Sequence, residues 1–134
     1  MRKAGFVFGA MVAIVLAFGT ATADEKVPNI KKIMQTVAGS KKEKGLCAKC
    51  AEAGKAAKWD DAQTLSKSLS ECVANLPKNA CPKGDEKSWE KLSKAFAEQA
   101  KVIEKAASDK DAKKLGEAVG AFTKACGECH KAHK

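Results

Sequence analysis

The sequence CGECHKAHK spans residues 126–134 and contains the arrangement Cys-x-x-Cys-His. In a helix, two cysteines three positions apart lie on the same face, so both thiols can bond to the vinyl groups of one haem. This pattern is typical of covalent haem c attachment. It predicts one haem c, held by thioethers from Cys126 and Cys129, with His130 as the proximal iron ligand. A thiol redox pair, or half of a zinc site that happens to precede a histidine, is the alternative interpretation.

The haem motif continues an apolar stripe that predicts a long final helix. The stripe consists of Leu115, Val119, Phe122, Cys126 and Cys129, at intervals of four, three, four and three residues. We expect this helix to begin at Ser108, with Asp111 in the capping-box position. Because the two haem cysteines lie on the core face, the porphyrin is expected between helices, with Phe122, Phe96 and Val119 as its neighbours.

Four earlier segments are also expected to be helical. The first covers residues 28–38, and a short second helix could occupy residues 46–58. A third begins after an Asp60 cap and is stopped by Pro77, and a fourth follows an Asp85 cap. The composition agrees, since the chain is rich in Ala, Lys, Leu and Glu and has no Tyr. Amphipathic helices with short connections predict an all-α fold, an antiparallel four-helix bundle.

Residues 1–23 are expected to be a secretory signal peptide. They begin with a charged start, continue with an apolar run over residues 4–18 and end in the small-residue sequence ATA. Cleavage after Ala23 would leave residues 24–134 as one haem-binding domain, exported to the periplasm with no stable membrane insertion. An uncleaved membrane anchor is the alternative, because the apolar run is at the short end of the spanning range.

The chain is basic, with 25 Lys and Arg residues against 16 Asp and Glu residues. Removing Arg2 and Lys3 with the signal peptide leaves 23 basic residues and a net charge near +7. A positive surface can steer a protein toward acidic redox partners or anionic surfaces. Lysine is nevertheless scattered along every predicted helix, as is typical of solvated faces. Nucleic-acid binding is not expected, since the chain is predicted to be exported and no aromatic residues interleave the lysines.

A helical bundle with a single Cys-x-x-Cys-His near the end of its last helix resembles the class II cytochromes c, the family of cytochrome c prime and its low-spin relatives. The resemblance covers residues 27–134 in architecture. The segment CPKGDEKSW, residues 81–89, is similar to a loop-to-helix segment of small periplasmic cytochromes. In the family, an aromatic and then a basic residue usually follow the haem motif, whereas this chain has His133 and Lys134. Members are often dimers through the first two helices, so the resemblance leaves a monomer and a homodimer open.

The resemblance also implies a distal iron ligand. In low-spin members a Met on the first helix is the axial ligand opposite the proximal histidine, and here that residue would be Met34. Five-coordinate members have no ligand at this position, and Met34 would then be an apolar residue of the helix seam. His133 is not expected to be the distal ligand, because it lies three residues from His130 on the same helical face.

Four cysteines are not used by the haem motif, namely Cys47, Cys50, Cys72 and Cys81. Cys47 and Cys50 lack a following histidine, so they are not expected to hold a second haem. An oxidising compartment and an even number of thiols favour disulfides. Of the three pairings that four cysteines allow, we expect Cys72–Cys81, which closes a small loop, and Cys47–Cys50 as a local redox-type pair. A zinc site built from all four cysteines is the alternative.

These features predict an electron carrier that cycles between Fe(III) and Fe(II) and exchanges electrons with redox partner proteins, not an enzyme. An open distal face would instead make the protein a binder of nitric oxide or carbon monoxide. A peroxidase-like haem enzyme is the least expected alternative. It needs a distal acid or base, and the only histidines are His130 and His133.

Overall fold

The structure, a computed structural model, describes residues 26–134, and the predicted signal peptide lies outside the described residues. The described chain is all-α, with five α-helices and no strand. The helices are α1 (Ile30–Ala38), α2 (Leu46–Lys55), α3 (Trp59–Val73), α4 (Glu86–Ser108) and α5 (Ala112–His133), and a 3₁₀ helix, η1 (Leu76–Lys78), follows α3. The predicted all-α class is therefore confirmed.

Aspartate side chains cap the two longest helices. Asp85 accepts a hydrogen bond from the Ser88 backbone N–H at 2.8 Å, which confirms the predicted start of α4. Asp111 caps α5 in the same way. The prediction that the last helix begins at Ser108 was wrong, because Ser108 is the final residue of α4. The chain then turns through Lys110, whose φ of 54° cannot continue a right-handed helix.

The bounds of α2 and α3 also differ from expectation. α3 begins at Trp59, so Asp60 is not its cap but lies in its first turn, where the positive end of the helix stabilises a carboxylate. The helix ends at Val73, and Pro77 belongs to η1. α2 stops before residue 58, because Ala57 adopts a positive φ of 55°.

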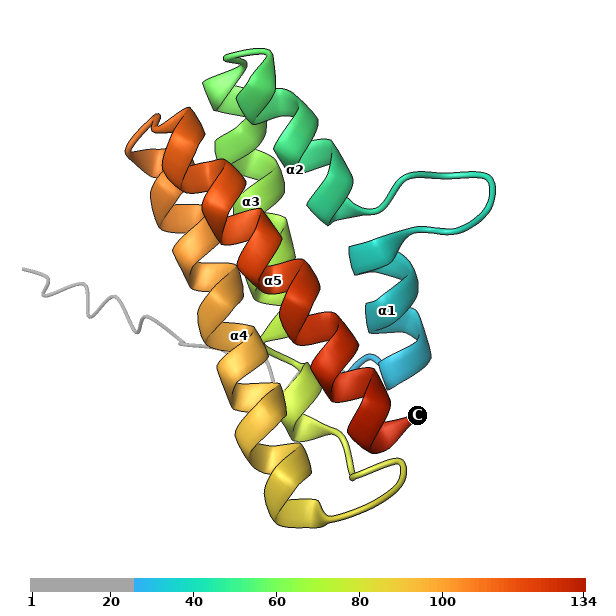
Figure 1. Ribbon diagram of the computed structural model, residues 1–134. Coiled ribbons are helices and arrows are strands. Elements are labelled where there is room, and N and C mark those ends of the chain that lie inside the picture. The colour runs from blue at the N-terminus through green and yellow to red at the C-terminus, as the bar shows by residue number, and fades with distance from the viewer. Residues whose placement is uncertain (1–25) are drawn as a thin grey trace, which may run out of the picture.

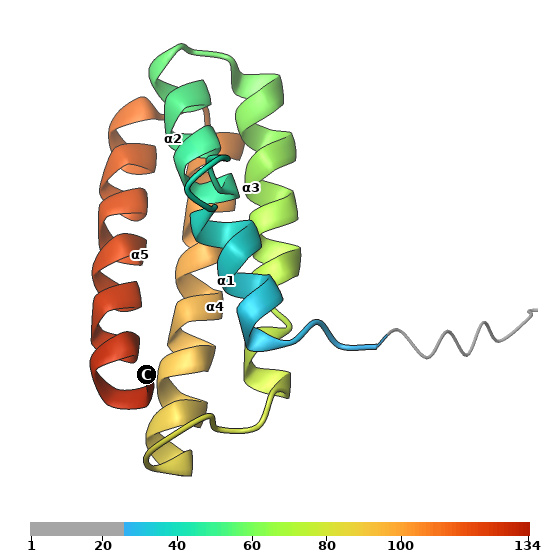
Figure 2. The same ribbon diagram turned by 90° about the vertical axis from the view of Figure 1, so that its right-hand side faces the viewer.

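The three long helices pack side by side, with α4 against both α3 and α5 (Figure 1). α2 packs against α3 and α5. The short helices α1 and α2 follow one another along one side of the molecule, separated by the loop of residues 39–45 (Figure 2). α1 packs against α2 and α3 but makes little contact with α5. The helix nearest the start of the described chain and the helix at its end are therefore not packed together.

The aromatic centre of the core joins α4 to α5. Phe96 and Phe122 stack with their ring centroids 4.2 Å apart and their planes 21° apart. Leu69, Ile103 and Leu115 are fully buried in the same hydrophobic core. Stacked aromatic rings of this kind add to the free energy gained from burial alone.

The buried face of α5 differs slightly from the predicted stripe. It consists of Leu115, Ala118, Phe122, Cys129 and His133. Val119 and Cys126 are only half-buried, at the flank of this face. The buried residues recur at intervals of three, four, seven and four, so Ala118 faces the core in place of Val119. His133 continues the same face one turn beyond Cys129.

Replacing Phe122 with alanine is expected to lower the free energy of unfolding by about 3–5 kcal/mol, because it leaves a cavity opposite Phe96. Val102→Ala on α4 is the matched control, since Val102 is 50% exposed and its truncation should cost no more than about 0.5 kcal/mol. Urea unfolding of both variants, at equal haem content, measures the two values. Similar losses for both would show that the Phe96–Phe122 stack is not central to the core.

Candidate functional site

An open cavity of about 500 Å³ lies between the start of α1 and the end of α5. Its wall, most of it apolar, includes Ile30 and Met34 of α1, Trp89 of α4, and Cys129, His130 and His133 of α5. The loop before α4 contributes the remaining side. The size falls within the range of small-molecule and cofactor sites, about 300–1,000 Å³. Three residues predicted for the haem site therefore line one cavity, although Met34 is far from Cys129 and His130 in sequence.

Helix α1 presents Met34 to the cavity because its neighbouring face is used for packing. Ile33 and Val37, one helical turn apart, are buried against the rest of the molecule. Ile30 and Met34 form the adjacent ridge, also one turn apart, and both are half-buried. The wall formed by α1 thus offers one thioether sulfur, a soft ligand suited to haem iron.

Helix α5 supplies the opposite wall from its last turns. Cys129 is 8% exposed and belongs to the core cluster, whereas the next residue, His130, is exposed and borders the cavity. Successive residues of a helix point about 100° apart, so the thiol and the imidazole approach the same space from different directions. The His130 ring is accessible to a ligand in the cavity.

Cys126, the other predicted anchor, does not line the cavity. It is half-buried on the side of α5 that packs toward α2, close to Cys47. Burial and the neighbouring Cys47 thiol raise the pKa of Cys126 to about 11. A haem bonded to both cysteines therefore requires the Cys126 side chain to turn from α2 toward the cavity.

The three residues predicted to contact the porphyrin lie elsewhere. Phe96 and Phe122 are buried against each other in the core, and Val119 is half-buried one turn earlier on α5. None of the three is part of the cavity wall. Trp89 and Ile30 supply the large apolar surfaces of the cavity instead.

All six cysteines of the described chain are free thiols, so neither predicted disulfide is formed in this structure. Cys72 lies beside Thr36 of α1, whereas Cys81 lies beside His133, with 3.7 Å between Sγ and Nδ1. Cys50 is fully buried in α2, and its thiol donates to the Ala62 carbonyl at 3.7 Å. Residues 26–134 contain no group of three His, Cys, Asp or Glu side chains arranged to hold a metal ion, and this includes the four cysteines considered for zinc.

Buried thiols are expected to react slowly in protein produced without haem. Burial is the main cause that raises the pKa of Cys50, and the Cys47 thiol adds to it, giving a value of about 11. The thiolate fraction at pH 8 then falls about a hundredfold relative to a thiol with its usual pKa. Mass-resolved iodoacetamide labelling should find Cys50 and Cys126 modified at least about tenfold more slowly in the native protein than in urea. Equal rates in both conditions would contradict the burial of these thiols.

His133 shares the cavity wall with His130, as its spacing of three residues predicts, but its burial was not predicted. It is 5% exposed, whereas His130 is exposed. Its ring lies edge-on to Trp89, with centroids 5.5 Å apart. The signal was present in the sequence, because His133 follows Cys129 by four residues and so continues the core face of α5.

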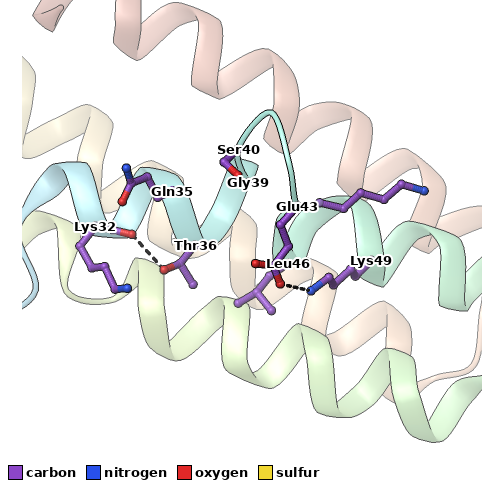
Figure 3. Close-up of a pocket in the computed structure, with 9 residues that line it drawn as sticks. Lys32, Gln35, Thr36, Gly39, Ser40, Glu43, Leu46 and Lys49 are labelled. Atoms are coloured by element: carbon purple, nitrogen blue, oxygen red, sulfur yellow. Dashed lines mark hydrogen bonds and ion pairs between the residues drawn. The ribbon is translucent and has the colours of Figure 1, made fainter.

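A second hollow, of about 490 Å³, lies at the turn between α1 and α2 (Figure 3). Some of its polar groups are paired with one another. Lys49 forms an ion pair with Glu43 at 3.2 Å, and the Thr36 hydroxyl donates to the Lys32 carbonyl at 2.9 Å. None of the predicted haem-site residues lines it. The cavity between α1 and α5 is therefore the candidate site.

No helix within residues 26–134 combines the length and the apolar character needed to cross a membrane. Comparisons of the whole chain with protein-family models, with curated proteins and with solved structures found no match.

Proposed function

We propose that the protein is a periplasmic monohaem c-type cytochrome that carries single electrons and has no substrate of its own. The cavity between α1 and α5 is the observation that supports this most, because its wall combines Met34 with Cys129 and His130. A thiol, an imidazole and a thioether are the groups that hold a His/Met-ligated haem c. The Cys-x-x-Cys-His motif supports haem c as the cofactor, and the predicted signal peptide supports export to the periplasm.

Each residue has a separate task in this proposal. A bound haem would supply a one-electron Fe(III)/Fe(II) couple. Cys126 and Cys129 would hold it covalently, so that it does not dissociate. His130 would bind the iron from the α5 side, and Met34 would bind it from the α1 side and raise its reduction potential. Apolar residues of the wall, Trp89 among them, would limit water at the iron.

The arrangement of the helices supports a finer proposal for the fold. α1 and α2 follow one another along one side and both pack against α3, while α2 and α4 also pack against α5 (Figures 1 and 2). In this proposal α1 and α2 together would take the place of the first helix of an antiparallel four-helix bundle, the architecture of the class II cytochromes c. The net positive charge favours encounter with acidic redox partner proteins.

An optical spectrum tests the proposal directly. The full chain is expressed with haem-attachment machinery, and spectra are recorded oxidised, reduced, and reduced with carbon monoxide. We expect sharp low-spin bands, a Met-to-iron charge-transfer band in the oxidised protein and little response to the gas. Broad high-spin bands with rapid gas binding would instead make the protein a five-coordinate binder of nitric oxide or carbon monoxide. Absence of covalent haem would refute both functions.

A further inference from the structure

We infer that His133 is a positioning residue, which sets the separation between Met34 on α1 and His130 on α5. The inference rests on the proposed function, in which these two side chains bind the iron from opposite sides. His133 lies in the last turn of α5 and is 5% exposed, and both of its ring nitrogens have partners. A buried polar ring with all of its groups satisfied holds its surroundings in one arrangement.

The partners of the ring fix its tautomer and join α5 to two other segments. Nδ1 lies 2.7 Å from the Lys83 carbonyl oxygen, and a carbonyl can only accept, so Nδ1 carries the proton. In the neutral ring Nε2 then accepts from the Ser88 hydroxyl, 3.2 Å away in the first turn of α4. His133 thus ties the end of α5 to the loop before α4 and to α4 itself.

The loop also approaches the backbone of α5 directly. Gly84 has a φ of 87°, and a side chain at this position would come within 2.9 Å of the Ala132 carbonyl oxygen. Only glycine allows this approach without strain. The Lys83 ammonium donates to the Lys134 carbonyl at 3.3 Å. The loop is therefore held against the last turn of α5 at several points.

A second set of contacts connects the same loop region to the start of α1. The Trp89 ring, which packs against His133, donates through Nε1 to the Asn79 carbonyl at 2.9 Å. The Asn79 side-chain amide in turn donates to the Pro28 carbonyl at 3.1 Å. Pro28 immediately precedes Asn29, the cap of α1. A continuous path therefore runs from His133 through Trp89 and Asn79 to the beginning of α1.

This path matters because α1 and α5 make little direct contact. Both walls of the cavity, with Met34 on one and His130 on the other, are instead attached to the same connection between α3 and α4. Weakening the path should loosen the wall that carries Met34 while His130 and the covalent anchors stay in place. The measurable consequence is easier displacement of the Met34 thioether by an added ligand.

The experiment is an imidazole titration of the oxidised protein with its haem, followed by loss of the Met-to-iron charge-transfer band. The Asn79→Ala variant removes the contact with Pro28, together with a local hydrogen bond from the same amide to the Asn75 carbonyl at 3.0 Å. Asn79 does not line the cavity. We expect Asn79→Ala and His133→Ala to bind imidazole at least about fivefold more tightly than the parent, the change that corresponds to one hydrogen bond. His133→Gln keeps a donor and an acceptor and should restore most of the parent behaviour.

Asn75→Ala is the matched control. The Asn75 side chain donates to the Glu71 carbonyl and accepts from the Lys78 ammonium. Both partners lie within four residues of Asn75, so these bonds do not reach α1 or α5. This variant should lose stability like Asn79→Ala but change imidazole affinity by less than about twofold. The comparison separates a general loss of stability from a specific effect on the position of Met34. The inference is wrong if Asn79→Ala binds imidazole like the parent, or if Asn75→Ala binds it as tightly as Asn79→Ala.

A separate readout distinguishes failure of the inference from failure of the proposed function. A parent protein with no Met-to-iron band would refute His/Met ligation. Amide hydrogen exchange of α1 in that same protein then tests the structural link itself. Faster exchange of α1 in Asn79→Ala and His133→Ala, but not in Asn75→Ala, would support the link, and unchanged exchange would refute it.

Discussion

Replacing Cys126 and Cys129 with alanine is expected to yield protein with no covalent haem. Either thioether alone would hold the cofactor by one bond. Removal of both would leave only the proposed ligation by His130 and Met34, which would not survive denaturation. Haem staining after denaturing electrophoresis, together with the intact mass, measures the result. The expected loss is complete.

The second Cys-x-x-Cys pair provides the matched control for this experiment. Cys47 and Cys50 have the same spacing but no following histidine, and they lie in α2, outside the wall of the cavity. Alanine at both positions should leave haem staining intact, with some loss of stability from the cavity at the fully buried Cys50. Staining that disappears with this pair and persists without Cys126 and Cys129 would place the haem on α2 and overturn the proposed site.

Replacing Met34 with alanine is expected to abolish the Met-to-iron band and to lower the reduction potential by on the order of 0.1 V, within the range over which axial ligands tune haem. An axial thioether stabilises reduced haem iron relative to oxidised iron, so its loss would favour Fe(III). The open position should then bind carbon monoxide rapidly in the reduced protein. Optical spectra and a redox titration of the variant measure all three changes.

Ile30→Ala is the control for Met34→Ala. Ile30 lies one turn earlier on the same wall of the cavity and is also half-buried, but it has no sulfur. Its truncation enlarges the cavity in a similar way and should preserve the band. If the two variants behave alike, Met34 acts through packing, and the gas-binding function becomes the better proposal.

Local patterns allowed much of the fold to be predicted. The spacing of neighbouring residues predicts three observed features, namely the Asp85 cap, the helix before Gly39 and the burial of Leu115 and Phe122. Where two signals competed nearby, as with Ser108 and Asp111, the prediction chose the wrong cap. The two helices are separated by Lys110, which adopts a left-handed backbone conformation. A lysine gives no indication of such a turn in the sequence.

The site was predictable only in part, because a cavity depends on contacts between distant segments. The motif identified Cys129 and His130, and a family resemblance pointed to Met34. In the fold these residues line the same cavity, Met34 from α1 and the other two from α5. Nothing in local spacing could show that Trp89 completes this wall or that Phe96 and Phe122 do not. The burial of His133 was recoverable in principle, from its register with Cys129.

The loop of residues 39–45 separates α1 from the remaining helices, and α1 buries only Ile33 and Val37. Such a nine-residue segment is a natural unit of local unfolding, since its release leaves the contacts among α2, α3, α4 and α5 unchanged. Detachment of α1 would remove the wall that carries Met34 and open the cavity further toward Cys129 and His130. In the proposed cytochrome, such an opening would allow an order of assembly, in which the haem is attached to α5 before α1 packs beside it.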